Sequence, residues 1–222
     1  MALTKYNYNS FDVTPVASKA LAFNSDADGL TTVAGGSMVL IKTLTASSSA
    51  TLSFVDGTSD VVLDNTYPIY DFKFINIHPA TNAVTFGFNG SIDAGSNYNV
   101  TKTTTQFTAF IAEADEGASL EYSGGEDIAQ GTGFQAFQQG DDLGGDNDQC
   151  HTGYLRIFNP SSTTFVKHFI AQAQYAHQGD YTANVFTAGY FNTTSAVDAM
   201  QFKMSSGNVD AGQIKLYGIK DS

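Results

Sequence analysis

Large aromatic side chains occupy every second position in a stretch near residue 70, and this spacing constrains the fold more than any other feature of the sequence. Tyr70, Phe72 and Phe74 alternate with the charged residues Asp71 and Lys73. Because successive side chains of a β-strand point to opposite faces of its sheet, this period of two predicts a strand with one aromatic face. We expect that face to lie in a hydrophobic core rather than to form an exposed binding platform.

Strand-like runs bounded by turn residues recur along the chain. Residues 38–45 and 50–55 flank a Ser-rich turn at 47–49, which predicts a β-hairpin. The alternating apolar residues at 84–88 predict a strand that pairs with the aromatic one. Further strands, separated by turn residues, are predicted at 154–159, 163–174, 181–191, 197–205 and 213–220.

These strands, roughly nine or ten in number, predict an all-β fold. We expect a two-sheet antiparallel sandwich of jelly-roll type, with one short helix and an N-terminal arm. The chain contains 17 Phe, 11 Tyr and no Trp, so aromatic rings should form much of the layer between the sheets. Its single cysteine cannot form an internal disulfide, so packing and strand pairing must stabilise the fold.

One segment has the periodicity of a helix instead. Phe107, Phe110, Ile111 and Ala114 are spaced three, four and seven residues from the first, which is typical of an amphipathic helix. The spacing predicts a short helix over 104–116 that lies on the sandwich or at its edge.

The chain divides into an N-terminal arm, residues 1–37, and a sandwich domain, residues 38–222. The arm has irregularly spaced apolar residues, short extended pieces are expected at 11–16 and 19–24, and a Gly-Gly pair marks its end. Two interpretations stay open for it, a flexible leader or an anchor that orders on a partner. The polar, Gly-rich segment 117–153 is long for a loop, so we expect it to contain a strand or two, with Phe134 and Phe137 as anchors.

The charge balance restricts the partners. With 22 acidic and 10 basic residues, the net charge is −12 and the isoelectric point about 4.4. Nucleic-acid phosphates and anionic lipids both require clustered Lys and Arg, so we expect neither partner. No apolar run is long enough for a membrane helix and none resembles a secretion signal, so we expect synthesis and folding in a cytoplasm.

An acidic loop is the strongest candidate for an ion site. Asp141, Asp142, Asp146 and Asp148 supply oxygen donors of the kind that Ca²⁺ prefers, and a solvated acidic loop is the alternative. The stretch 24–29 resembles the opening of an EF-hand loop but lacks its later glutamate, so a tight turn is favoured there. We expect no other cofactor.

The histidines and the cysteine have no catalytic spacing. His78, His151, His168 and His177 are too irregularly placed for a zinc motif, so structural roles are favoured for them. Cys150 and His151 could pair as nucleophile and base only if neighbouring strand residues shared a face, which they do not.

Acidic residues around the expected helix leave one enzymatic alternative open. Glu113, Asp115, Glu116 and Glu121 include enough carboxyl groups for glycoside hydrolysis, which needs two of them across a sugar cleft. A solvated helix surface is the interpretation that we favour, so no catalytic residue is assigned and the chain is not expected to be an enzyme.

Five segments of the chain carry sequence fingerprints rather than chemical motifs. They are LIKTLTAS at 40–47, YDFKFINIHPAT at 70–81, FNPSSTTFVKHF at 158–169, GYFNTT at 189–194 and IKLYGIK at 214–220. These segments resemble structural proteins of tailed phages of aquatic bacteria, and the resemblance covers most of residues 38–222.

The resemblance implies a virion structural protein, made in the bacterial cytoplasm and fixed to the particle. We expect a tail-fibre or adhesin component that attaches to other virion proteins through its arm and contacts host surface glycans. Homo-oligomers are expected, with trimers by analogy to other phage appendages. The alternatives are a capsid decoration protein that bridges capsid subunits and a glycan depolymerase. The resemblance assigns no binding residue.

Overall fold

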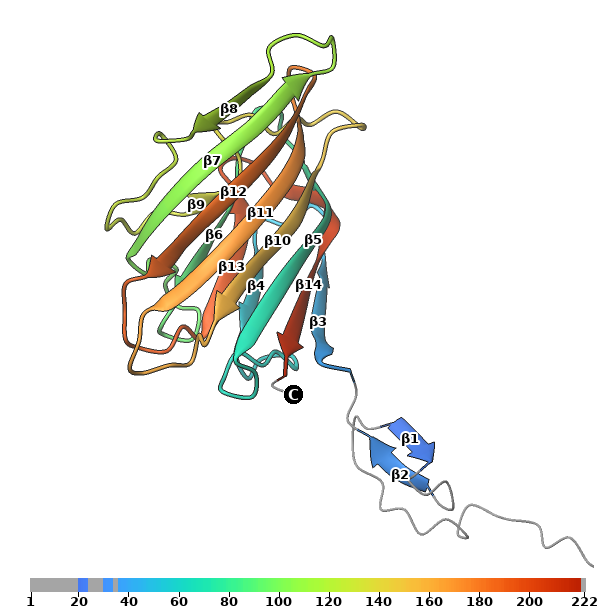
Figure 1. Cartoon of the computed structure of the whole chain (residues 1–222), viewed down its shortest axis with the longest axis vertical. Helices are drawn as coiled ribbons and strands as arrows, with labels where there is room; N and C mark the ends of the chain where they lie inside the picture. The colour runs from blue at the N-terminus through green and yellow to red at the C-terminus, as the bar shows by residue number, and fades with distance from the viewer. Residues whose placement is uncertain (1–19, 24–29, 34–35, 221–222) are drawn as a thin grey trace, which may run out of the picture.

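Alternating burial along the strands organises the chain into two facing sheets. The computed structural model describes residues 20–23, 30–33 and 36–220, and within them every strand pairing is antiparallel. Eight strands form a broad sheet and four form a narrow sheet behind it (Figure 1). The predicted all-β, two-sheet sandwich is therefore confirmed.

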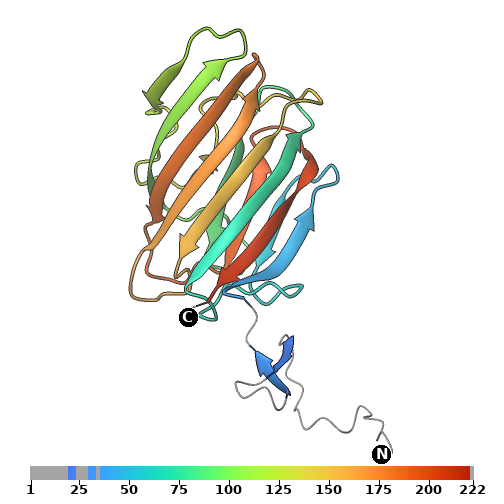
Figure 2. The same ribbon diagram turned by 45° about the vertical axis from the view of Figure 1, so that its right-hand side comes forward.

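The strands of the broad sheet lie in the order β3-β14-β5-β10-β11-β12-β7-β8, and Figure 2 shows them side by side. Its strands are β3 (Met38–Thr45), β5 (Ile69–Pro79), β7 (Lys102–Ala112), β8 (Ser119–Tyr122), β10 (His151–Phe158), β11 (Lys167–His177), β12 (Tyr181–Phe191) and β14 (Val209–Ile219).

The narrow sheet has the order β4-β13-β6-β9. Its strands are β4 (Leu52–Val55), β6 (Phe86–Ser91), β9 (Gln135–Ala136) and β13 (Ala199–Met204). The chain crosses between the two sheets repeatedly, for example from β3 to β4 and from β12 to β13, as it does in jelly-roll sandwiches.

Aromatic rings fill the space between the sheets. Phe72 of β5 lies edge-to-face with Phe54 of β4, with ring centroids 5.3 Å apart. Phe74 packs against Phe86 of β6 at 5.5 Å and against Phe202 of β13 at 5.3 Å. All five rings are buried, so the prediction that the aromatic face of β5 belongs to the core is confirmed.

Two predicted pairings are wrong, although the strands themselves exist. β3 pairs with β14 and β4 with β13, so the expected hairpin of residues 38–55 does not form. β6 belongs to the narrow sheet and faces β5 across the core instead of pairing with it. Strand alternation predicts which residues share a face, but it does not predict which sheet the next strand joins.

The predicted helix over 104–116 is wrong, because residues 102–112 form strand β7. Thr104, Gln106 and Thr108 of this strand are buried, whereas Phe107 and Ile111 are 44% and 39% exposed on the opposite face. Phe107 and Ile111 therefore lie on the solvent face of β7, whereas Phe110 packs against the core, so the helical spacing of these residues is coincidental. Pairing with β12 along the whole strand overrides the local pattern.

The N-terminal region contains one short hairpin among its described residues. β1 (Ala20–Phe23) pairs with β2 (Leu30–Val33), which confirms the extended piece expected at 19–24. The piece expected at 11–16 and the EF-hand-like stretch 24–29 lie outside the described residues. The anchoring role of residues 1–37 stays a prediction.

The connection from β7 to β10, residues 113–150, closes one side of the sandwich. It pairs as β8 with the free edge of β7, follows that edge to Gly131, and joins the narrow sheet as β9 beside β6. Leu143 then bridges Val84 and His177. The strands expected in this segment are thus present. Of its two predicted anchors, Phe137 is fully buried and Phe134 is half-buried.

Candidate functional site

Small and large side chains alternate across three strands and leave an open cavity at one end of the sandwich. The strand registers align Phe110 of β7, Ala183 of β12 and Tyr175 of β11 in one row on the inner face of the broad sheet. Because Ala183 lies between two aromatic residues and is much smaller than either, a hollow remains above it. The hollow has a volume of about 660 Å³.

The walls of this cavity combine aromatic rings with carboxylates. Tyr181 packs edge-to-face against Phe110, with ring centroids 5.9 Å apart. β8 and the connection after it supply Glu121, Tyr122 and Glu126. The cavity therefore offers apolar ring surfaces beside hydrogen-bond acceptors, which is the usual composition of a ligand site.

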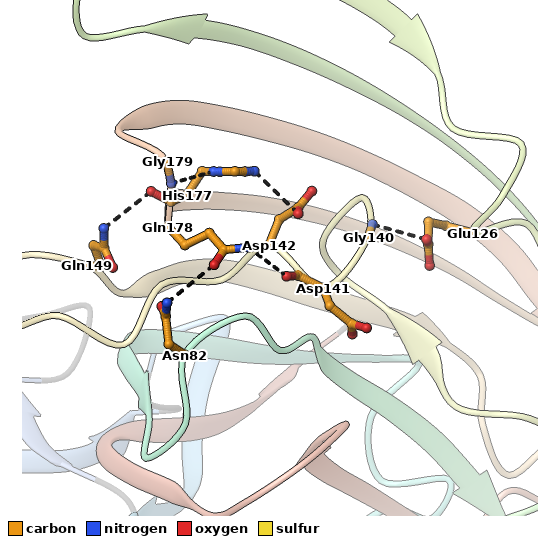
Figure 3. A network of polar contacts seen from close by, with 9 residues as sticks. All are labelled: Asn82, Glu126, Gly140, Asp141, Asp142, Gln149, His177, Gln178 and Gly179. Carbon is orange, nitrogen blue, oxygen red and sulfur yellow. Dashed lines mark hydrogen bonds and ion pairs between the residues drawn. The ribbon is translucent and has the colours of Figure 1, made fainter.

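A histidine and an aspartate lie in polar contact on the cavity wall (Figure 3). His177, the last residue of β11, lies with its Nε2 3.3 Å from Asp142 Oδ1. The amide N–H of Gly179 donates to His177 Nδ1 at 2.8 Å, so Nδ1 is an acceptor and the ring proton lies on Nε2. The imidazole therefore presents its N–H to the carboxylate.

Burial and charge act on Asp142 in opposite directions. Burial raises the pKa of Asp142, and the attraction to His177 partly opposes that rise. A carboxyl group with a raised pKa holds its proton at a higher pH than an exposed one does. Beside it, the Gly140 amide donates to Glu126 Oε1 at 3.0 Å, which fixes a second carboxylate at the cavity wall.

Amide side chains fix the acidic loop against the turn between β11 and β12 (Figure 3). Gln178 donates to the carbonyl of Asp141 at 3.3 Å and accepts from Asn82 at 3.2 Å. Gln149 donates to the carbonyl of His177 at 3.3 Å. These contacts tie three distant segments together, so the cavity wall is held by the fold rather than by one loop alone.

The four aspartates proposed as calcium ligands have separate environments. Asp142 pairs with His177, Asp141 accepts from Ser205 at 3.3 Å, and Asp146 and Asp148 are exposed. Within the described ranges, no three Asp, Glu, His or Cys side chains are grouped as ion ligands would be. Calcium binding by this loop stays a prediction, and the geometry adds no support for it.

The acidic residues proposed for glycoside hydrolysis are also separated. Glu113, Asp115 and Glu116 are exposed at the turn between β7 and β8, and only Glu121 reaches the cavity. The carboxylates that Glu121 meets there, Glu126 and Asp142, come from the connection that follows β8. Sequence reasoning missed these neighbours because strand pairing, not sequence spacing, brings them together.

The histidines and the cysteine have distinct surroundings. Cys150 is half-buried and burial raises the pKa of its thiol, which lowers its reactivity. His151 is buried, and Gln138 Nε2 donates to its Nδ1 at 2.8 Å, so the acceptor nitrogen of the ring is occupied and does not serve the cysteine as a base. His168 is exposed on the outer face of the broad sheet and His78 lies 3.8 Å from Asp210.

Buried amides continue from the cavity into the sandwich. Thr104 donates to Gln135 at 2.6 Å, Gln135 donates to Gln106 at 3.1 Å, and Gln106 donates to the carbonyl of Gln138 at 3.2 Å. These bonds join the polar inner face of β7 to the connection of residues 113–150. They satisfy polar groups that burial would otherwise destabilise.

Comparisons with known proteins leave this geometry as the main guide to function. The chain matches no family model, no curated protein and no solved structure. Within the described residues, no helix is long and apolar enough to cross a membrane.

Proposed function

We propose that the chain is a bacteriophage virion structural protein, of the tail-fibre or adhesin kind, that attaches through its N-terminal residues and binds host surface glycans. The sequence resemblance to phage structural proteins supports the first part of this proposal. The observation that carries the second part is the cavity, which places tyrosine rings beside carboxylates. Sugar rings pack their C–H faces on aromatic rings, and their hydroxyl groups donate to carboxylates.

The position of the cavity supports the proposal. β3 begins and β14 ends at one end of the sandwich, whereas the β7–β8 and β11–β12 connections lie at the opposite end (Figure 1). The cavity lies at this second end, because Phe110, His177 and Tyr181 are at or near those connections. A protein attached through its N-terminal segment would thus present the cavity away from the attachment point.

Location on the particle tests the first part of the proposal. Gold-tagged antibody on purified particles should mark the tail in electron micrographs. Gold distributed over the head, in copies near the number of capsid subunits, would instead support the capsid decoration alternative and remove the role in host binding.

Cavity variants test the glycan site. Ala183→Leu should fill the hollow between Phe110 and Tyr175, and Tyr122→Ala should remove an exposed ring of the wall. Each should weaken the binding of purified protein to host surface polysaccharide by at least about tenfold, as loss of packing in a ligand pocket does. Glu116→Gln, at an exposed position outside the cavity, is the matched control. Unchanged binding by both cavity variants would contradict the site.

One observation favours the depolymerase as a second candidate. Asp142 has a raised pKa and shares the cavity with Glu121 and Glu126, and glycoside hydrolysis needs a protonated carboxyl group opposite an ionised one. If the wild-type protein releases reducing ends from host polysaccharide, Asp142→Asn should abolish that release. Absence of any released sugar with the wild-type protein would reject this candidate.

A further inference from the structure

The middle of the broad sheet is almost free of acidic residues. The adjacent strands β5, β10, β11, β12 and β7 contain a single one, Asp71, in a chain that has 22. No other described element covers the outer face of these strands (Figures 1 and 2). The other acidic residues of the chain lie outside these strands, so the outer face of the strands carries no exposed acidic side chain.

The single acidic residue on this face is buried under two cations. Asp71 is fully buried, and its Oδ2 lies 3.0 Å from Arg156 Nη2 and 3.1 Å from Lys73 Nζ. Arg156 is the register partner of Asp71 on β10, and Tyr217 is its partner on β14. One carboxylate therefore serves two positive charges, which leaves a surplus of positive charge at this point.

A third cation lies directly beside this group. Lys215 of β14 is the register partner of Lys73, and Tyr154 of β10 is the partner of Lys73 on the other side. Among the described residues, Lys215 forms no ion pair, although like charges directly opposed on a sheet are destabilising. Lys73 Nζ lies 4.8 Å from the centroid of the Tyr154 ring, so the cation and the ring form one surface.

The same row continues across the sheet with amide and aromatic groups. After Tyr154 come Gln172 of β11, Phe186 of β12 and Phe107 of β7, and the two Phe rings are stacked 5.0 Å apart. Gln172 donates to Asn184 at 3.0 Å, which keeps the amides extended along the surface. From Lys215 to Phe107 the row crosses six adjacent strands, or roughly 24 Å at the usual strand spacing.

We propose that this row binds an acidic polysaccharide across the strands of the broad sheet. The cations Lys73, Lys215 and Arg156 would contact its carboxylate, sulfate or phosphate groups, and the amides and rings would contact its hydroxyl groups and sugar faces. A flat face suits a polymer, because it cannot enclose a small ion but can hold several weak contacts of one chain. The glycan ligand extends the proposed function, whereas the charge argument is independent of the cavity.

The density of charge favours a polysaccharide over a nucleic acid. Duplex DNA carries about one negative charge per 1.7 Å, and a protein with a net charge of −12 and three clustered cations would repel it. An acidic polysaccharide carries one charge per sugar or per repeat, which matches a small group of cations at the end of an uncharged row.

Calorimetry with purified full-length protein tests the site. Alginate fragments, with one carboxylate per sugar, probe carboxylates, and κ-carrageenan fragments, with one sulfate per disaccharide repeat, probe sulfates. Dextran is the uncharged reference. We expect binding to one or both anionic polymers, weakened by salt, and none to dextran. Lys215→Gln should weaken that binding about fivefold, and the Lys73→Gln/Lys215→Gln double variant by more than tenfold. Lys215 has no ion pair to lose, so the single variant should keep its fold, which thermal unfolding checks.

The matched control is Lys203→Gln, because Lys203 lies on β13 of the narrow sheet, over the ring of Phe134. Binding by this variant should equal that of the wild type. Equal losses at Lys203 and Lys215, tight binding of single-stranded DNA, self-association that removes Lys215 from solvent, or no binding of either anionic polymer would each overturn the proposal. Polymer binding by a protein that labels the phage head would keep this site and reject the adhesin role.

Discussion

His151 lies fully buried on β10, where burial lowers its pKa to about 3. Its ring lies 5.2 Å from Phe86 and 5.4 Å from Phe137, centroid to centroid. The neutral ring accepts from Gln138 at Nδ1, so its proton is on Nε2, which has no partner among the described residues. Sequence reasoning assigned His151 a structural role, but its pKa depends on rings from other strands that no local pattern brings together.

This burial predicts an acid-sensitive fold. As the pH falls from about 6.5 to about 3, the unfolded chain takes up a proton at His151 and the native one does not, so the free energy of unfolding decreases. The decrease from this group is on the order of 4 kcal/mol. His151→Phe should remove it, which urea unfolding at a series of pH values would measure.

The control for this prediction is His168→Phe, since His168 is exposed. Its profile of unfolding free energy against pH should follow that of the wild type. Parallel profiles for the wild type and His151→Phe would mean that His151 titrates normally in the native protein.

At the scale of elements, strand existence was easier to predict than strand pairing. The period of two marked β5 and the C-terminal strands, because their apolar residues face the core. It failed for β7, because Thr104 and Gln106 face inward there and bond to the amides of the covering connection. An apolar sequence pattern predicts the buried face of a strand only where the side chains on that face pack against apolar neighbours.

Close packing of β12 against β7 and β11 predicts that a substitution at Gly189 destabilises the fold. A Cβ there would lie 2.5 Å from the carbonyl oxygen of Thr103 and 2.9 Å from the ring of Phe169. Gly189→Ala should therefore lower the free energy of unfolding by about 2 kcal/mol, through forced displacement of packed atoms. Urea unfolding would measure the change, with Gly133→Ala as the control, because a Cβ at Gly133 meets nothing within 4 Å. Equal stability of both variants would contradict the tight approach of β12 and β7.

At the scale of the whole molecule, composition and periodicity were sufficient to predict a two-sheet sandwich with an aromatic core. The cavity was not predictable in the same way. Ala183, Tyr175 and Glu126 carry no motif, and their proximity follows from strand registers and from the path of residues 113–150. Of the predicted site residues, the cavity contains Asp142 and Glu121 only.

Strand pairing also predicts that the sandwich folds without its N-terminal region. All pairings of the two sheets involve residues between Met38 and Ile219. A chain that begins at Met38 should unfold within about 2 °C of the full-length protein, because no sheet hydrogen bond is lost. Differential scanning calorimetry measures this, and a complementation assay should find the shortened protein absent from particles. A large drop in unfolding temperature would contradict the division into arm and sandwich. Normal incorporation would contradict the anchoring role of residues 1–37.

The evolutionary constraints on the connection of residues 113–150 differ from those on the central strands. It supplies Glu121, Tyr122 and Glu126 to the cavity, yet it contributes only two short strands, both at sheet edges. Under the proposed glycan-binding function, substitutions and length changes in this segment would alter the ligand while the central strand registers stay fixed. A lineage that must follow a changing host surface would gain new specificity by diversifying this one segment on an inherited frame.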